Sequence, residues 1–179
     1  MKLALAITIV VLIGCVSALA QRNPKKPASR DVAAEVILVP ELPLNVHEAA
    51  LVKTDKGYFL KCRFSSTADV PLIGMRYSLT VIEPITGAAR PVTNRIEGFD
   101  LPSYSSKTLT FATPIKFHQT DGSRLVLMLE QVVSRESIWE VIKAKDVLEC
   151  YIKGDYSIEP HVLRVANQVD APLQTRVIY

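Results

Sequence analysis

Residues 73–82 read IGMRYSLTVI, and apolar side chains occupy every second position of this stretch. Successive side chains of a β-strand point to opposite faces, so a period of two predicts a strand with one buried face. This segment is the clearest element in the chain, and it indicates a mainly-β fold. The alternating apolar residues are Ile73, Met75, Tyr77, Leu79 and Val81.

A second alternating stretch precedes it at residues 58–64, YFLKCRF. Lys61 and Arg63 separate the last three of its four apolar positions, so one face is again predicted to be buried. Just upstream, the sequence Asp-Lys-Gly ending at Gly57 is typical of a tight turn, because glycine accepts a positive φ without steric cost. Residues 46–52 are another candidate strand, and the sequence therefore predicts a hairpin around Gly57.

Several other segments have strand character. Residues 125–133 (LVLMLEQVV) are almost continuously apolar, which is typical of a central strand buried on both faces. Residues 36–39 (VILV) are followed by Pro40 and Pro43, which predicts an edge strand or a strapped-down arm. Shorter strands are expected at residues 91–96, 107–111 and 137–142, with a loop at residues 101–106.

Residues 146–153 (DVLECYIK) fit two kinds of structure. Asp146 is a suitable N-cap and Gly154 a suitable residue just past a helix C-terminus, which favours a short helix. The spacing of Leu148, Cys150 and Ile152 also fits a strand. Residues 160–179 are expected to form an irregular tail that ends in the strand-like sequence TRVIY.

Together these segments predict an antiparallel β-sandwich of about seven to eight strands, with one short C-terminal helix. Residues 44–142 resemble small immunoglobulin-like domains of bacterial envelope proteins and lipoproteins. The resemblance lies in the order of the segments: a strand ending in Cys-Arg-Phe at Phe64, a polar break, a long alternating strand, a Pro/Gly turn and a strand pair. It implies an immunoglobulin-like sandwich, and we expect a single domain over residues 34–179.

The N-terminal residues 1–20 have the features of a secretory signal peptide. Lys2 precedes an apolar run that is shorter than the roughly 20 residues needed to cross a bilayer. The sequence Ala-Leu-Ala ending at Ala20 suits a general signal peptidase that cuts before Gln21. Residues 12–15 (LIGC) also resemble the lipobox of bacterial lipoproteins, in which Cys15 would carry the lipid. Both patterns are present, so free export and membrane anchoring through Cys15 stay open.

Residues 21–33 follow as a basic, Pro-containing tether. Export predicts a periplasmic or secreted protein in an oxidising compartment, where Cys62 and Cys150 are a candidate disulfide pair. A bridge that closes so long a loop would contribute about 4–5 kcal/mol by the chain-entropy argument. Cys62 lies on the predicted inner face of its strand, whereas the position of Cys150 depends on whether its segment is helix or strand.

Residues that could carry chemistry are sparse. The three histidines, His47, His118 and His161, have no ligand-like spacing to one another or to Cys, Asp or Glu, so neither a metal nor a cofactor is expected. No GxSxG elbow or phosphate-binding glycine loop occurs. The chain has 21 Lys and Arg against 18 Asp and Glu, a balance that argues against nucleic-acid binding.

These features favour an exported, non-catalytic envelope domain that binds another envelope protein or stabilises an assembly. Contact with a membrane is expected only through a lipid on Cys15. Tyr104 and Trp139 are the candidate partner contacts, although Trp139 also suits a place in the core. A partner could instead add a strand at residues 36–39 or 176–179. The alternative is an enzyme or ligand-binding domain whose site combines residues distant in sequence.

Overall fold

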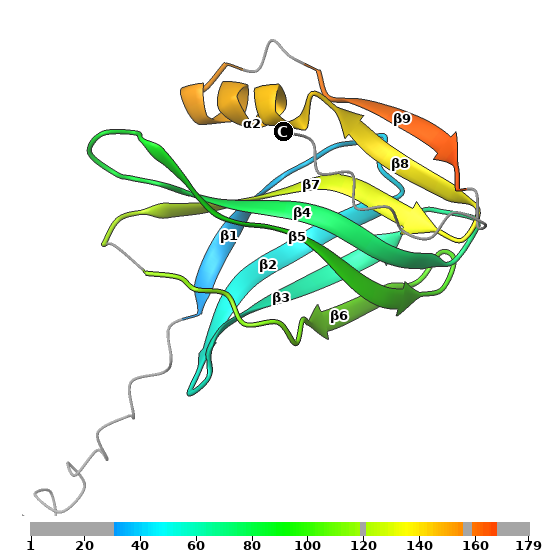
Figure 1. The fold of residues 1–179 in the computed structure, drawn as a ribbon, viewed down its shortest axis with the longest axis horizontal. Coiled ribbons are helices and arrows are strands. Elements are labelled where there is room, and N and C mark those ends of the chain that lie inside the picture. Colours follow the sequence, from blue (N-terminus) through cyan, green and yellow to red (C-terminus); the bar gives the residue numbers. More distant parts are fainter. Residues whose placement is uncertain (1–30, 119–120, 156–158, 168–179) are drawn as a thin grey trace, which may run out of the picture. The chain divides into compact units, whose positions relative to one another are not determined.

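The computed structural model describes residues 31–118, 121–155 and 159–167 (Figure 1). All of the described residues belong to one compact unit that begins at Asp31. The predicted signal peptide with Cys15, most of the tether and the strand-like stretch at residues 176–179 therefore lie outside the described residues.

Nine strands and one helix form the described part of the chain, which confirms the mainly-β prediction. No helix in these ranges combines the length and the apolar character needed to cross a bilayer. The elements are β1 (Val32–Ile37), β2 (Leu44–Thr54), β3 (Gly57–Ser66), β4 (Leu72–Ile82), β5 (Ala89–Leu101), β6 (Ser106–Thr110), β7 (Arg124–Ser134), β8 (Ser137–Ile142), α2 (Ala144–Lys153) and β9 (His161–Ala166).

All nine strands belong to one sheet, in the order β5-β4-β7-β1-β2-β3-β6, with β8 paired to β7 and β9 paired to β8. β1 joins the two halves of this sheet, because Val32 to Ala34 pair antiparallel with β2 whereas Ala34 to Ile37 pair parallel with β7. β1 as a whole is therefore an internal strand of the sheet, although Val36 and Ile37, within the predicted edge strand or arm, pair with β7 alone. The parallel β1–β7 pair also makes the sheet mixed instead of purely antiparallel.

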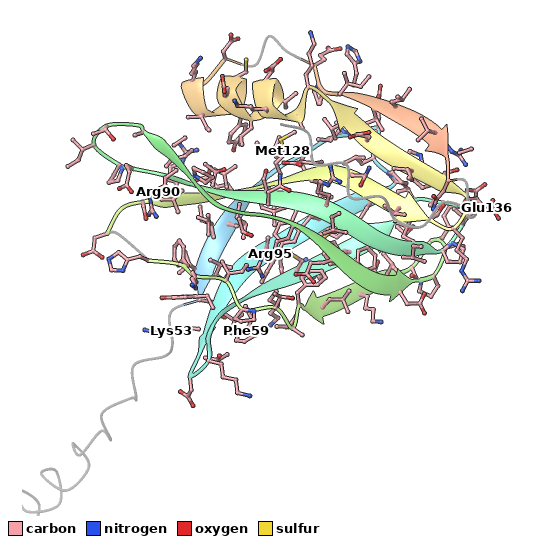
Figure 2. All side chains as sticks on the ribbon, in the orientation of Figure 1. Lys53, Phe59, Arg90, Arg95, Met128 and Glu136 are labelled. Carbon is pink, nitrogen blue, oxygen red and sulfur yellow. The ribbon has the colours of Figure 1, made fainter. Side chains whose placement is uncertain are left out.

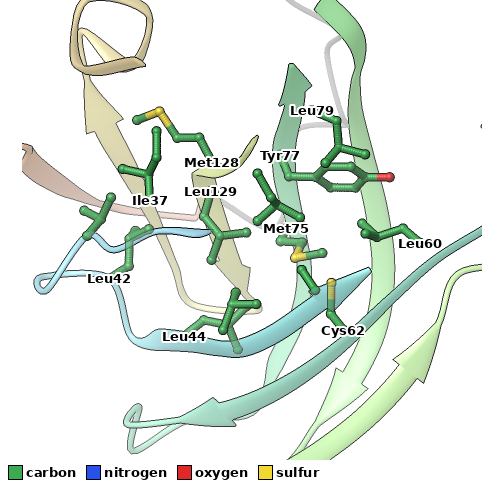
Figure 3. Close-up of a cluster of buried hydrophobic side chains, with 14 of the residues drawn as sticks. Ile37, Leu42, Leu44, Leu60, Cys62, Met75, Tyr77, Leu79, Met128 and Leu129 are labelled. Atoms are coloured by element: carbon green, nitrogen blue, oxygen red, sulfur yellow. The ribbon is translucent and has the colours of Figure 1, made fainter. Parts of the chain in front are cut away.

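The sheet curls at β1, and its two halves enclose the core (Figures 1 and 3). Phe64 on β3 stacks on Phe99 on β5, with ring centroids 5.8 Å apart, and Phe111 lies 6.4 Å from Tyr77 on β4. The hydrogen-bonded order is thus one curled sheet, and the immunoglobulin-like sandwich stays a prediction. Four of the five residues predicted to face inward along β4 are fully buried: Met75, Tyr77, Leu79 and Val81. Ile73, predicted on the same face, is 36% exposed beside the register shift between Leu72 and Gly74. Ser78, Thr80 and Ile82 are buried as well, so the second half of β4 is covered on both faces and the prediction of a single buried face is wrong there.

β7 has the central position that its apolar sequence predicted. It pairs with β4 on one side and with both β1 and β8 on the other. All residues from Leu125 to Leu129 are buried, so both faces of this strand are covered. Met128, on the face opposite to that of Leu129, lies beneath α2 (Figures 2 and 3).

α2 is the predicted short helix, and it begins two residues earlier than Asp146. Lys143 precedes it with a left-handed φ of 54°, and Asp146 lies in its first turn. Gly154 ends it as predicted, in the left-handed conformation and with its N–H donating to the Tyr151 carbonyl. The spacing i, i+3, i+4, i+7 of the residues that contact the core decides for helix over strand. These residues are Ala144, Val147, Leu148, Tyr151 and, at i+8, Ile152.

Two predicted boundaries were wrong, and one turn was right. The short strand expected at residues 91–96 is the 13-residue β5, which continues through Gly98. The irregular tail expected from residue 160 contains β9, which pairs with β8 along its whole length. The hairpin around Gly57 is confirmed, because Thr54 pairs with Gly57, whose φ is +123°.

Candidate functional site

One end of the sheet carries three neighbouring connections, which we call the loop end. The Tyr104 N–H donates to the Ala68 carbonyl at 3.3 Å and joins two of them. Leu72 at the start of β4 pairs with both Leu101 at the end of β5 and Ser134 at the end of β7, so the connection that follows β7 lies at the same end. The connections are residues 67–71 between β3 and β4, residues 102–105 between β5 and β6, and residues 135–136 between β7 and β8.

Tyr104 is the exposed aromatic residue that the sequence predicted, with 71% of its surface accessible. Its φ is 49°, a left-handed conformation that costs a non-glycine residue about 1–2 kcal/mol. The turn is held in place by the Ser105 hydroxyl, which donates to the Pro102 carbonyl at 2.6 Å, and by the bond to Ala68. The surrounding backbone therefore fixes a strained turn that presents an aromatic ring to solvent.

A cleft of about 390 Å³ lies at the same end of the sheet. Apolar groups come from the start of β4, and both signs of charge come from the end of β5 and the β7–β8 turn. Such a mixed lining suits a protein surface with both apolar and polar groups better than it suits a purely apolar ligand. The lining residues are Val70, Pro71, Ile73, Asp100, Arg135 and Glu136.

Trp139 is not a surface contact, because only 7% of it is exposed and it belongs to the hydrophobic core. The Arg164 guanidinium lies 4.9 Å from the centroid of its ring, and the Arg164 Nε donates to the Ser137 hydroxyl at 3.1 Å. The prediction of Trp139 as a partner contact is therefore wrong. Period two on β8 places Trp139 and Val141 on the inner face, and Arg164 covers the ring from β9.

A second depression is a groove of about 310 Å³ between the end of β1 and α2, which we call the α2 groove. Its lining is mainly apolar but includes the acidic residues Asp155 and Glu159. Leu38, at its rim, is exposed, whereas Ile37 and Val147 are buried at its base. Cys150 also lines it, together with Tyr151. The groove could take an apolar group of small-molecule size, for which pockets of about 300–1,000 Å³ are usual.

A third hollow, of about 420 Å³, lies over β1, β2, β3 and β6 beside the β-bulge in β2. The bulge brings His47 to Ser65, and Nε2 lies 2.7 Å from the hydroxyl. Glu48 pairs with Arg63 at 3.0 Å, so the nearest carboxylate is engaged elsewhere. No carboxylate among the described residues contacts His47 to orient it, and both partners are exposed, so the pair lacks the third group that activates a serine.

The two cysteines are free thiols in the structure, so the candidate disulfide is not formed in it. Cys62 is buried within β3, and burial raises the pKa of its thiol to about 12, which makes it unreactive. Cys150 lies on α2 and faces the α2 groove. The sequence left open whether Cys150 belongs to a helix or a strand. The structure places it on a helix, and this fixes its position at the α2 groove.

An ion pair connects three elements near the start of the sheet. Both oxygens of Glu35 on β1 accept hydrogen bonds from Arg124 on β7, including one from Nε at 2.8 Å. The Tyr151 hydroxyl of α2 also donates to Glu35, at 3.4 Å. The hydrogen bond from Arg124 lowers the pKa of Glu35 below its ordinary value of 4.5, and the charge of Arg124 and the bond from Tyr151 add to this effect against partial burial.

This ion pair should make stability depend on acid pH. A carboxylate with a lowered folded-state pKa contributes stability above its unfolded pKa, and loses it as pH falls through the folded pKa. We expect Glu35→Gln to lower the free energy of unfolding at pH 7 by up to about 1 kcal/mol, since the pair is half exposed. Urea unfolding at a series of pH values should show the gap to wild type closing below pH 4.5. A gap that is equal at pH 7 and in strong acid would contradict this assignment.

No group of three or more His, Cys, Asp or Glu residues in the described ranges is arranged to hold a metal ion. His118 and His161 are both exposed and lie on different elements. No protein-family profile, curated protein or solved structure matches this chain. Within the described residues, the loop end offers an exposed aromatic ring and the α2 groove a mainly apolar depression.

Proposed function

We propose that this chain is an exported, non-catalytic envelope domain that binds another envelope protein through its loop end. Export rests on the signal-like residues 1–20. The binding role rests on Tyr104, an exposed aromatic ring on a strained turn that neighbouring backbone groups hold in place. Aromatic residues with little conformational freedom are the usual anchors of protein interfaces.

The position of Tyr104 relative to the chain entry supports this role. The described domain begins at Asp31, and Val32 pairs with Leu51 close to the β2–β3 hairpin. The loop end lies at the other end of the sheet (Figure 1). A domain tethered through its N-terminal residues, whether by a lipid on Cys15 or not, would thus present Tyr104 away from its attachment.

Photo-crosslinking in exporting cells tests this proposal. A photoreactive phenylalanine analogue replaces Tyr104, and the matched control places it at Ile85, which is 95% exposed in the β4–β5 turn at the opposite end. We expect position 104 to give one reproducible product with a single envelope protein, and position 85 to give none. Tyr104→Ala should then weaken binding of that purified partner at least about tenfold.

Two outcomes would reject the loop end as the interface. One is the same set of products from positions 104 and 85, which would indicate random collision. The other is a purified partner that binds Tyr104→Ala as tightly as it binds wild type.

The α2 groove favours a second candidate function, the binding of an apolar small molecule. Its volume and the exposed rim residue Leu38 support this alternative, and its lining combines residues from β1 and α2 that are distant in sequence. Retention of an apolar ligand by the protein purified from its native compartment would favour it over the loop end.

A further inference from the structure

Among the described residues β9 pairs with β8 alone, so within that part of the chain it is an edge strand (Figure 1). The Val162 N–H points away from β8 and donates to the Glu41 carboxylate at 2.9 Å. Since N–H groups alternate sides along a strand, those of Arg164 and Ala166 face the same open edge. The Val162 N–H is already bonded to Glu41, so this edge is a template for another strand only if the Glu41 carboxylate moves aside.

The outward face beside this edge is mainly apolar, although the exposed Glu140 and His161 also lie on it. Leu163 and Val165 are 50% and 39% exposed on β9, and Ile142 on β8 is exposed as well. Leu163 lies opposite Glu140 and Val165 opposite Ile138, so the exposed side chains share one face of the β8–β9 pair. A strand added at the edge would cover part of this strip.

We propose that a second copy of this chain adds its own β9 to this edge, antiparallel and about a two-fold axis at Leu163. In this register Leu163 faces its own copy, His161 faces Val165, and Val162 faces Arg164. The Val162 and Arg164 positions carry the edge N–H groups, so they become the hydrogen-bonded pairs of the new ladder. The proposal goes beyond the loop-end function and does not depend on it.

Charge complementarity favours this occupant and this register. The Arg164 guanidinium is fixed by Trp139 and Ser137, and it would face Val162 of the second copy. Within each copy the Glu41 carboxylate accepts the Val162 N–H. When this N–H bonds to the added strand instead, the released Glu41 carboxylate would lie near Arg164 of the other copy. The two-fold axis makes this contact twice. A shift that centres the axis on Arg164 would instead place two like charges opposite each other, which is destabilising.

Charge reversal at these two positions tests the proposal directly. In a homodimer, Glu41→Arg opposes two arginines and Arg164→Glu opposes two glutamates, so each variant alone should dimerise at least about tenfold more weakly than wild type. In a mixture of the two variants, a pair made of one copy of each has opposite charges at both contacts, so the mixture should form heterodimers. Because recovery in the mixture requires both variants to be folded, it separates lost pairing from lost structure.

Sedimentation equilibrium of the purified protein up to about 1 mM measures the association. Two six-residue edges bury less than a standard interface of about 1,600 Å², so we expect a dimer that dissociates on dilution. Leu163→Lys should abolish it. The matched control is Ile96→Lys, which adds the same charge to an exposed apolar residue of β5 and should leave the dimer unchanged.

Three results would overturn the proposal. A protein that is monomeric throughout this concentration range has no such dimer. A wild-type dimer that Leu163→Lys leaves intact uses another surface. Hydrogen exchange that finds the Arg164 and Ala166 amides already protected in the monomer would mean that another segment of the same chain, or a co-purified partner, occupies the edge.

Discussion

Phe64→Ala should lower the free energy of unfolding by about 4 kcal/mol, because it removes a fully buried aromatic ring that the neighbouring rings cannot replace. Phe64 stacks on Phe99 and also lies 6.2 Å from Phe111, so it links β3 to the opposite half of the curled sheet. Losing it leaves a cavity between the two halves as well as the transfer free energy of the ring. Urea denaturation, followed by the fluorescence of Trp139, measures the change.

Phe59→Ala is the matched control, because it deletes the same ring from the same strand. Phe59 is partly exposed, and its odd position places it on the face opposite to that of Phe64. We expect a loss of about 1 kcal/mol, in proportion to its smaller burial. Equal losses at the two positions would mean that the two faces of β3 are equally buried, and would contradict the placement of the core.

The core faces of β3, β4 and β7 could be predicted from sequence because the pattern of apolar residues within each strand indicates which of its side chains are buried. An alternating strand such as β3 buries every second side chain from Leu60 to Phe64, and a strand covered on both faces, such as β7, is mostly apolar. In β4 the alternating apolar residues Met75 to Val81 mark the core face, although the polar residues between Tyr77 and Ile82 are buried too. The hairpin at Gly57 was equally local, since the positive φ of the turn selects glycine.

The position of β1 could not be predicted in the same way, because strand order depends on pairing between distant segments. Pro40 and Pro43 suggested an edge strand because proline cannot donate a backbone hydrogen bond. Both prolines follow the end of β1 at Ile37, so they do not interfere with its pairing on either side. β9 was missed for a related reason. Its sequence, HVLRVA, is short and holds Arg164, whose place over Trp139 depends on the β8–β9 register.

Only part of the candidate site was visible in the sequence. The loop between β5 and β6 indicated that Tyr104 is exposed, but no residue pattern indicates its left-handed φ. That conformation is held by a bond within the loop and by hydrogen bonds to Ser66 and Ala68 in one other segment. The contact between His47 and Ser65 was also hidden, because the bulge after Val46 shifts the β2–β3 register. Neither feature leaves a local sequence signal beyond the residues themselves.

Val147→Asp should detach α2 from the sheet and lower the free energy of unfolding by about 3 kcal/mol. Val147 is the buried residue of α2, and it belongs to the same hydrophobic core cluster as Met128 on β7. A carboxylate there would lose its hydration without gaining a partner in the apolar contact between helix and sheet. We therefore expect a lower urea midpoint, with loss of helical circular dichroism before the sheet unfolds.

Lys145→Asp is the control for this substitution, because it places the same carboxylate two residues earlier on the same helix. The Lys145 side chain is 87% exposed, and its contact with Glu149 is only a 4.0 Å surface pair. An acidic residue in the first turn also interacts favourably with the helix dipole, so the net change should stay within about 0.5 kcal/mol. If both variants were equally stable, α2 would contribute no buried face, and the α2 groove would lose the wall that defines it.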